Sequence, residues 1–142
     1  MAKVGRPSKF SDGLAEQICS ALTDGKSLRS ICLQDDLPNQ TTVFRWLADE
    51  RYSEFRKQYA SAREVQADAI FDECLDIADD GANDYMGDDE KYNGDHVARS
   101  RLRIDTRKWM AGKLAPKKYG EKLDVDVSGN LTVQIIRFGD VE

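Results

Sequence analysis

The spacing of apolar residues predicts three short helices in the first third of the chain. Ser11 or Asp12 is a suitable N-cap for the first helix, and Gly25 is a suitable stop because glycine readily adopts the left-handed conformation that follows many helices. Ser27 can cap a second short helix, and Pro38 disfavours helical backbone in the residue before it, so a turn is expected there. The apolar face of the first helix contains Leu14, Ile18, Ala21 and Leu22.

The third helix, within residues 38–50, places apolar and polar residues on opposite sides. At 100° per residue, an arc that we expect to be buried contains Val43, Phe44, Leu47 and Ala48. The side that we expect to be exposed contains Thr41, Thr42, Arg45 and Asp49, and Trp46 lies at the border. Three such helices predict a helix-turn-helix arrangement whose last helix enters the major groove of DNA. A small helical bundle whose polar stripe faces water is the alternative interpretation.

The polar side of this helix suggests how it would contact DNA. Threonine hydroxyls and the helix N-terminus suit phosphates, and arginine suits a phosphate or a guanine edge. Asp49 would be repelled by phosphates unless Arg45 or Arg51 neutralises it. The candidate DNA contacts on the third helix are Gln40, Thr41, Thr42 and Arg45.

The first nine residues are mostly polar and basic and show no apolar periodicity, which predicts a flexible arm. The sequence Gly5-Arg6-Pro7 fits the minor groove, because arginine is attracted by its negative potential and proline keeps the chain extended. A frayed terminus that is merely basic is the other interpretation. The candidate DNA contacts outside the third helix are Lys3, Arg6, Lys9, Lys26 and Arg29.

A long helix is predicted from Ser53 to about Ala78, and a further helix over residues 97–114 that Pro116 ends. The long helix carries two apolar stripes and therefore has two neighbours. Residues 79–95 between these helices are rich in acidic and turn residues, and we expect a solvated loop without strands.

Charge is segregated between these two helices. Residues 64–98 contain twelve Asp and Glu and one Lys, whereas residues 99–123 contain nine Lys and Arg and two acidic residues. Pairing of the two segments predicts an antiparallel hairpin, within one chain or between subunits. The alternative is that the stripe of Arg99, Arg103 and Arg107 binds DNA.

The apolar period changes to two near the end of the chain. Val125 and Val127, and then Leu131, Val133 and Ile135, alternate with polar residues around Ser128-Gly129-Asn130. This pattern predicts two strands joined by a tight turn. A lone hairpin is only marginally stable, so we expect its partner strands to come from other subunits.

Composition excludes several classes of function. The chain has 142 residues and 33% charged residues, with no apolar run of the roughly 20 residues that cross a membrane. It contains no phosphate-loop, zinc-protease or hydrolase motif, so no catalytic residue, metal site or cofactor is predicted. Cys19, Cys32 and Cys74 are interpreted as reduced core residues, and His96 as a solvated or capping residue.

Four segments together resemble the small terminase subunit of tailed bacteriophages, of the Shigella phage Sf6 type. The resemblance covers nearly the whole chain, and TVFRWLA followed by RLRIDTRKW and KYG is its most specific part. The segments are GRPSKF, TTVFRWLADE, FRKQYASAREVQADAIFDE and ARSRLRIDTRKWMAGKLAPKKYGEK.

The resemblance implies a mainly α-helical subunit of a ring-shaped homo-oligomer. The implied parts are a flexible basic arm (1–10), a helix-turn-helix DNA-binding domain (11–52), a helical-hairpin oligomerisation domain (53–120), and C-terminal strands and a tail (121–142) that form an intersubunit β-barrel. The residues expected to support oligomerisation are Phe55, Tyr59, Ile70, Phe71, Leu102, Trp109, Val133 and Ile135.

The resemblance also implies a function in packaging the viral genome. Such a subunit binds double-stranded viral DNA at the packaging initiation site and recruits and regulates the large terminase subunit, an ATPase and nuclease, in the host cytoplasm. No catalytic activity and no membrane partner are expected for it. A dimeric helix-turn-helix transcription regulator and a purely structural ring that does not grip DNA specifically are the alternatives.

Overall fold

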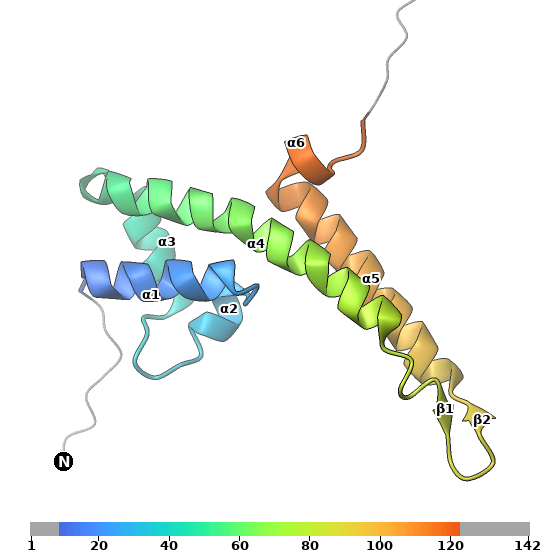
Figure 1. Ribbon diagram of the computed structural model, residues 1–142. Helices are drawn as coiled ribbons and strands as arrows, with labels where there is room; N and C mark the ends of the chain where they lie inside the picture. The colour runs from blue at the N-terminus through green and yellow to red at the C-terminus, as the bar shows by residue number, and fades with distance from the viewer. Residues whose placement is uncertain (1–8, 123–142) are drawn as a thin grey trace, which may run out of the picture.

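The computed structural model describes residues 9–122 of the 142, and the chain is mainly α-helical, as predicted. Helices α1, α2 and α3 cluster beside the first half of α4, and α5 runs back along the second half of α4 (Figure 1). The elements are α1 (Asp12–Thr23), α2 (Leu28–Ile31), α3 (Gln40–Ala48), the 3₁₀ turn η1 (Glu50–Tyr52), α4 (Ser53–Asp79), β1 (Tyr85–Met86), β2 (Lys91–Tyr92), α5 (Gly94–Leu114) and α6 (Pro116–Tyr119).

Short polar side chains begin the three N-terminal helices. The Ser11 hydroxyl accepts a hydrogen bond from the amide of Leu14, and the Ser27 hydroxyl accepts one from Ser30. Such caps satisfy amides that have no partner within the helix. Gly25 follows α1 with φ +85°, a conformation that side chains rarely adopt, so the predicted stop is confirmed.

Aromatic side chains join the N-terminal helices to the start of α4. Phe10 stacks on Tyr52, with ring centroids 4.1 Å apart, and meets Trp46 edge to face at 5.2 Å. Phe55, on the first turn of α4, is 2% exposed and lies 5.7 Å from Phe10. The aliphatic residues of the same core are Ala15, Ile18, Leu22, Leu28, Ile31, Leu37, Val43 and Ala62.

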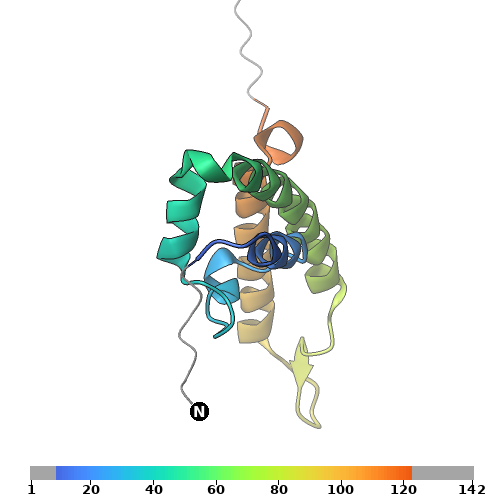
Figure 2. The same ribbon diagram turned by 90° about the vertical axis from the view of Figure 1, so that its left-hand side faces the viewer.

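The long helix α4 packs mainly against two other helices, α1 and α5, which agrees with its two apolar stripes. Its first half packs against α1, and its second half packs against α5. The thiol of Cys74, on the second half of α4, lies 3.9 Å from the carbonyl oxygen of Ile104 on α5. Views from two directions show that α3 and α5 lie on different parts of the molecule (Figures 1 and 2).

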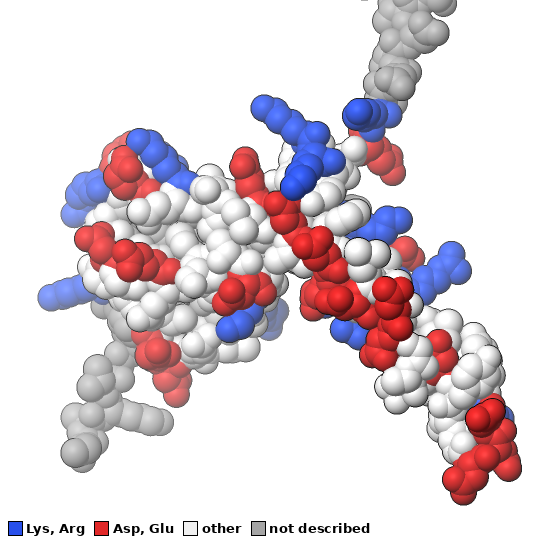
Figure 3. All heavy atoms as spheres, viewed as in Figure 1, with Lys and Arg blue, Asp and Glu red and all other residues white. Residues whose placement is uncertain are grey.

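The acidic and basic segments of the hairpin pair within one chain. Arg107 Nε on α5 lies 2.7 Å from Glu73 Oε2 on α4, and Lys118 Nζ on α6 lies 2.7 Å from Asp68 Oδ1. Acidic residues nevertheless cover the exposed side of the second half of α4 and the tip beyond it (Figure 3). The ion pairs within the chain therefore neutralise only some of the charged residues of the acidic and basic segments.

The loop predicted over residues 79–95 contains two short strands, so the prediction of a strand-free loop was wrong. Tyr85 pairs with Tyr92 and Met86 with Lys91 in an antiparallel ladder. The tyrosine rings, 6.1 Å apart, form the kind of cross-strand aromatic pair that stabilises a hairpin. All four strand residues are exposed, and the strands predicted around Val133 and Ile135 lie outside the described residues.

Candidate nucleic-acid interface

The exposed side of α3 differs from the predicted one. Val43 and Trp46 are buried, with 0% and 6% of their surface exposed, and Thr42 is 4% exposed. Phe44 is 51% exposed, which contradicts its predicted burial, and Ala48 is also exposed. The residues on the outward side of the helix are Thr41, Phe44, Arg45 and Ala48.

Local hydrogen bonds explain why Thr42 faces inward. Its hydroxyl donates to Oδ1 of Asn39 over 2.9 Å, and its amide donates to the same oxygen over 2.8 Å. The hydroxyl is therefore satisfied although it is buried, which removes most of the cost of burying it. Thr42 serves in the N-cap of α3 and does not lie on the exposed face with which it was predicted.

The core determines how α3 is rotated about its axis. The ring of Trp46 fills the space between Phe10 and Phe55, at centroid distances of 5.2 and 6.4 Å. Burying this large ring stabilises the fold more than burying Phe44 at the same place, because the buried area is larger. The sequence pattern placed Trp46 at the border and so misplaced the centre of the buried arc.

Two of the predicted basic contacts line one shallow groove beside α3. Arg45 and Lys9 line an open groove of about 440 Å³, together with Arg51 and Tyr52. Within the described part of the chain, Arg45 makes no hydrogen bond or ion pair, and its side chain is exposed. The structure therefore brings Arg45 and Lys9 together on the same side of the molecule.

The remaining predicted contacts lie elsewhere. Lys26 and Arg29 are exposed near the start of α2, beyond the far end of α1, and the 12-residue helix α1 is roughly 18 Å long. Gln40 is half-buried at the first position of α3. Lys3 and Arg6 lie outside the described residues.

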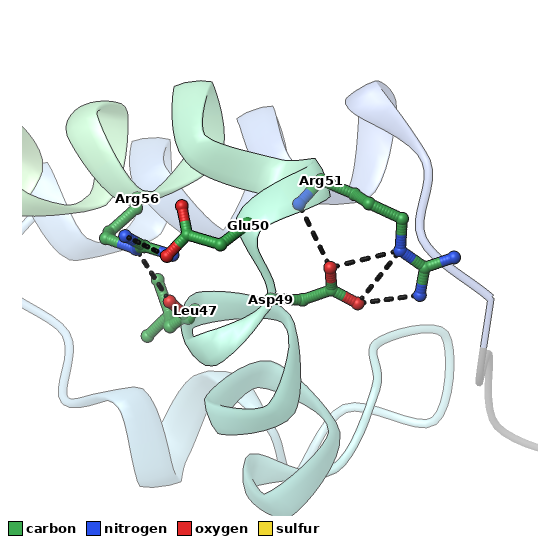
Figure 4. A network of polar contacts seen from close by, with 5 residues as sticks. All are labelled: Leu47, Asp49, Glu50, Arg51 and Arg56. Atoms are coloured by element: carbon green, nitrogen blue, oxygen red, sulfur yellow. Dashed lines mark hydrogen bonds and ion pairs between the residues drawn. The ribbon is translucent and has the colours of Figure 1, made fainter.

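An ion pair neutralises the acidic residue that follows α3. Arg51 Nη2 lies 2.6 Å from Asp49 Oδ2, and Arg51 Nε lies within 3.1 Å of both carboxylate oxygens (Figure 4). The hydrogen bonds from the Arg51 side chain and backbone lower the pKa of Asp49 from 3.8 to about 2. Of the two arginines that could neutralise Asp49, Arg51 is the one that pairs with it, so the carboxylate is not an unpaired charge beside this face.

A second contact fixes α3 relative to α4. Arg56 Nε on α4 donates to the carbonyl oxygen of Leu47 over 2.8 Å, and Arg56 Nη2 lies 3.3 Å from Glu50 Oε1 (Figure 4). The carbonyl groups of the last helical turn have no partner within their own helix, so a charged donor there is favourable. This contact holds the outward face of α3 in a defined orientation on the long helix.

Two residues predicted to support oligomerisation are already buried within one chain. Phe55 is 2% exposed in the N-terminal core, and Ile70 on α4 is 4% exposed. Neither side chain is available to a second subunit, so both assignments were wrong. Their apolar character identified them as interface residues, but their apolar neighbours lie in the same chain.

Other predicted oligomerisation residues are available on the hairpin surface. Leu102 and Trp109 on α5 are 58% and 67% exposed. Phe71 stacks on Tyr119 at 4.6 Å, and both line a groove of about 820 Å³ together with Trp109. Tyr59 is half-buried, and its hydroxyl accepts a hydrogen bond from Arg63 Nη2 over 2.7 Å.

The described residues contain no group of three or more His, Cys, Asp or Glu side chains that could hold a metal ion. Cys32 and Cys74 are buried and Cys19 is half-buried, and burial raises the pKa of the Cys19 and Cys74 thiols. The amide of His96 donates to the capping side chain of Asn93, and His96 Nε2 lies 3.9 Å from Asp84 Oδ1. Between residues 9 and 122, no helix is long and apolar enough to cross a membrane.

These features define a class of small helical protein that carries an exposed arginine-bearing helix face on one part and a long charged hairpin on another. The family model described as "Bacteriophage Sf6, terminase small subunit-like" matches residues 10–126. The chain therefore belongs to the Sf6 terminase small subunit-like family. Among curated proteins, no sequence is similar enough to count as a match.

Solved structures of a terminase small subunit have the same fold. Three crystal structures of single-substitution variants of the terminase small subunit gp1 of the bacterial virus Sf6 are similar to this chain, with 34%, 35% and 36% sequence identity. Their TM-scores are 0.67 to 0.68, and the matches cover 93% of this chain and 96% of gp1. The mainly helical fold class and the resemblance to small terminase subunits are thus confirmed.

Proposed function

We propose that this chain packages phage DNA as the recognition subunit of a terminase. In this role it binds double-stranded viral DNA at the packaging initiation site, has no catalytic activity of its own, and recruits and regulates the large terminase subunit in the cytoplasm of the infected host. The observation that carries the proposal is the family match over residues 10–126 combined with the exposed α3 face that bears Arg45.

The proposed DNA-binding domain is the helix-turn-helix arrangement of α1 to α3, with α3 in the major groove. Arg45 would contact a phosphate or a guanine edge, and the exposed hydroxyl of Thr41 would contact a phosphate near the helix start. Lys9 lies beside Arg45 and extends this basic side, and Arg51 keeps Asp49 from repelling the duplex. Lys26 and Arg29 would meet a different part of the DNA, roughly one α1 length away.

Simultaneous binding by several subunits explains how a few basic residues on each subunit are enough to hold the DNA. Each N-terminal unit offers only a few cations, and each phosphate contact contributes modestly. In a ring, several units present their α3 faces to the same DNA, so the binding energies combine through avidity.

We infer that the ring forms when the outer face of α5 on one subunit meets the outer face of α4 on the next. The exposed apolar residues on α5, Leu102 and Trp109, are flanked by exposed basic residues. The large exposed apolar residues on α4 are Val65, Phe71 and Leu75, and they lie among acidic ones. Two different faces with opposite charge favour a head-to-tail contact, which closes into a ring when the rotation between subunits permits.

The experiment for DNA binding compares Arg45→Ala with Lys57→Ala. Lys57 is an exposed lysine paired with Glu54 on α4, so its replacement controls for a change of one positive charge. We expect Arg45→Ala to weaken binding to phage DNA and to make the slope of log affinity against log salt concentration shallower by about one for each phosphate that Arg45 neutralises. Unchanged affinity of Arg45→Ala at low salt would show that this face does not bind DNA.

The experiment for the ring uses native mass spectrometry and charge reversal. We expect a closed assembly larger than a tetramer for the wild type. We expect no closed assembly for the double variant R99E/R101E on α5 alone or for the double variant D72K/D76K on α4 alone. A mixture of the two should form the assembly again, because the reversed charges are complementary. A dimer for the wild type would favour a transcription regulator instead.

A further inference from the structure

We propose that Phe44 reads thymine, through the C5 methyl group that thymine alone presents in the major groove. The inference rests on the proposed function, because it requires α3 to lie in the groove. It assigns a specificity-determining role to a residue that the sequence pattern placed in the core.

Phe44 lies at the centre of the outward face of α3. The buried residues Thr42, Val43 and Trp46 define the inward side, and 100° per residue places Phe44 and Ala48 nearest the opposite direction. Phe44 is 51% exposed, whereas four other aromatic rings pack together on the inward side of the same helix. Single exposed apolar residues are common, so the position of Phe44 on the helix is more informative than its exposure.

The neighbours of Phe44 shape the face for a close approach to base edges. Thr41 precedes it by three residues and Ala48 follows by four, so all three share this face. Both neighbours are small, so the phenyl ring is the most prominent apolar group on the face. The carboxylate of Asp49, which follows the helix, is held by Arg51 at 2.6 Å.

The chemistry of the major groove favours one target for this ring. Each base pair presents hydrogen-bond donors and acceptors there, and thymine adds its methyl group, which phenylalanine, alanine and the threonine methyl contact favourably. Arg45, at the edge of the same face, supplies the positive charge that holds the helix near the phosphates. An apolar centre with a basic edge thus matches a thymine-containing groove.

The area of the face argues against a protein partner as its main ligand. A stable protein interface buries about 800 Å² on each side, with a central apolar cluster of several residues. The outward face of α3 has one large apolar side chain, and the extensive exposed apolar surface lies on α4 and α5 instead.

The experiment replaces thymine by deoxyuridine, which forms the same base pair and lacks only the C5 methyl group. Duplexes of about 30 base pairs, selected from a random pool by binding to the wild-type protein, are prepared with either base, and affinities are measured by fluorescence anisotropy. We expect the wild type to bind the thymine duplex about fourfold more tightly for each methyl group contacted. Phe44→Ala should bind both duplexes equally.

Two further variants separate this role from general binding. Tyr85→Ala removes another exposed aromatic ring, on β1 and far from α3, and the protein with this substitution should still prefer the thymine duplex. Arg45→Ala should weaken binding to both duplexes and keep their ratio. Phe44 is half exposed, so its replacement leaves the core intact, and circular dichroism checks this.

Three results would overturn the inference. Equal binding of both duplexes by the wild type would show that no methyl group is read, while DNA binding itself would stand. A preference that persists in Phe44→Ala would assign the discrimination to DNA shape or to another residue. If the selection yields no duplex that the wild type binds, the proposed function is overturned together with this inference.

Discussion

The hydroxyl of Tyr119 donates a 2.6 Å hydrogen bond to Oδ1 of Asp68, the same oxygen that Lys118 Nζ approaches to 2.7 Å. Asp68 lies on α4, and both partners lie on α6, at the end of the described chain. The Tyr119 ring also stacks on Phe71 at 4.6 Å. One carboxylate thus anchors α6 to the long helix.

We predict that Asp68→Asn releases α6 without unfolding the protein. The substitution removes the charge that pairs with Lys118, and exposed pairs of this kind contribute little to global stability. Hydrogen exchange should become faster at the amides of α6, and those of α4 should be unaffected. The matched control is Asp72→Asn, an exposed carboxylate one turn away. Equal protection of α6 in Asp68→Asn and the wild type would contradict the anchor.

The same anchor should depend on pH at both extremes. Hydrogen bonds from Lys118 and Tyr119 lower the pKa of Asp68 below 3.8, so its contribution is complete above that value and is lost as the pH falls through the lowered pKa. The pKa of Tyr119 is raised above 10.0, chiefly by its hydrogen bond to Asp68, so its contribution is lost as the pH rises through that raised value. We expect the opening of α6 that permits exchange to be rare and constant between about pH 5 and 9, and more frequent opening within that range would contradict the prediction.

The ion pair between Asp49 and Arg51 should influence DNA binding through repulsion. In Arg51→Ala the carboxylate of Asp49 loses its partner, its pKa rises from about 2 toward 3.8, and its charge is left uncompensated beside the proposed DNA face. We predict that Arg51→Ala weakens binding and that the double variant D49N/R51A recovers most of the affinity. A double variant as weak as Arg51→Ala would show that Arg51 contacts DNA directly.

The sequence predicted the helices and their caps well because these depend on neighbouring residues. Ser11, Ser27 and Gly25 act locally, and the caps and the stop were correctly identified. The rotation of α3 was not predictable in this way, because it depends on how Trp46 fits between Phe10 and Phe55, which are distant in the sequence. The Asn39 cap offered a local signal that Thr42 would face inward.

In the candidate site, too, some features were predictable from the sequence and others were not. The exposure of Arg45 was predicted correctly, because a charged residue on an amphipathic helix favours the polar side. The exposure of Phe44 was missed, because a pattern of apolar residues cannot tell an exposed phenylalanine from a buried one. Phe55 and Ile70 were assigned to an interface for the same reason, since apolar periodicity does not reveal whether the neighbour belongs to the same chain.

Gln66 is a fully buried amide that links α4 to the turn after α1. Its Nε2 donates to the carbonyl oxygen of Lys26 over 2.8 Å, and its Oε1 accepts from Arg63 Nη1 over 2.8 Å. Gln66→Leu keeps the volume but leaves the Lys26 carbonyl without this partner, so we predict a loss of about 1–3 kcal/mol in the free energy of unfolding. Urea denaturation measures it, with the exposed Gln58→Leu as control, for which a change within about 0.5 kcal/mol is expected. Equal stability of the two variants would show that water replaces the amide.

A pair of aromatic substitutions should separate folding from assembly. Phe55 is 2% exposed in the N-terminal core, whereas Trp109 is 67% exposed on α5. Phe55→Ala leaves a cavity among Phe10, Trp46 and Tyr59, so the free energy of unfolding of the monomer should fall by about 3–5 kcal/mol. Trp109→Ala should change that free energy by no more than about 0.5 kcal/mol, because most of the ring is exposed within its own chain.

Assembly into the ring should depend on Trp109 and should tolerate a conservative change at Phe55. Trp109→Ala removes the largest exposed ring from the α5 face. We therefore expect native mass spectrometry to show smaller assemblies of this variant at concentrations where the wild-type protein is fully assembled. A conservative Phe55→Leu variant, which keeps most of the core volume, should assemble as the wild type does. If Trp109→Ala assembles normally while Phe55→Leu does not, the contact between subunits would have to lie on the N-terminal helices, and the charge complementarity of α4 and α5 would serve only the hairpin within each chain.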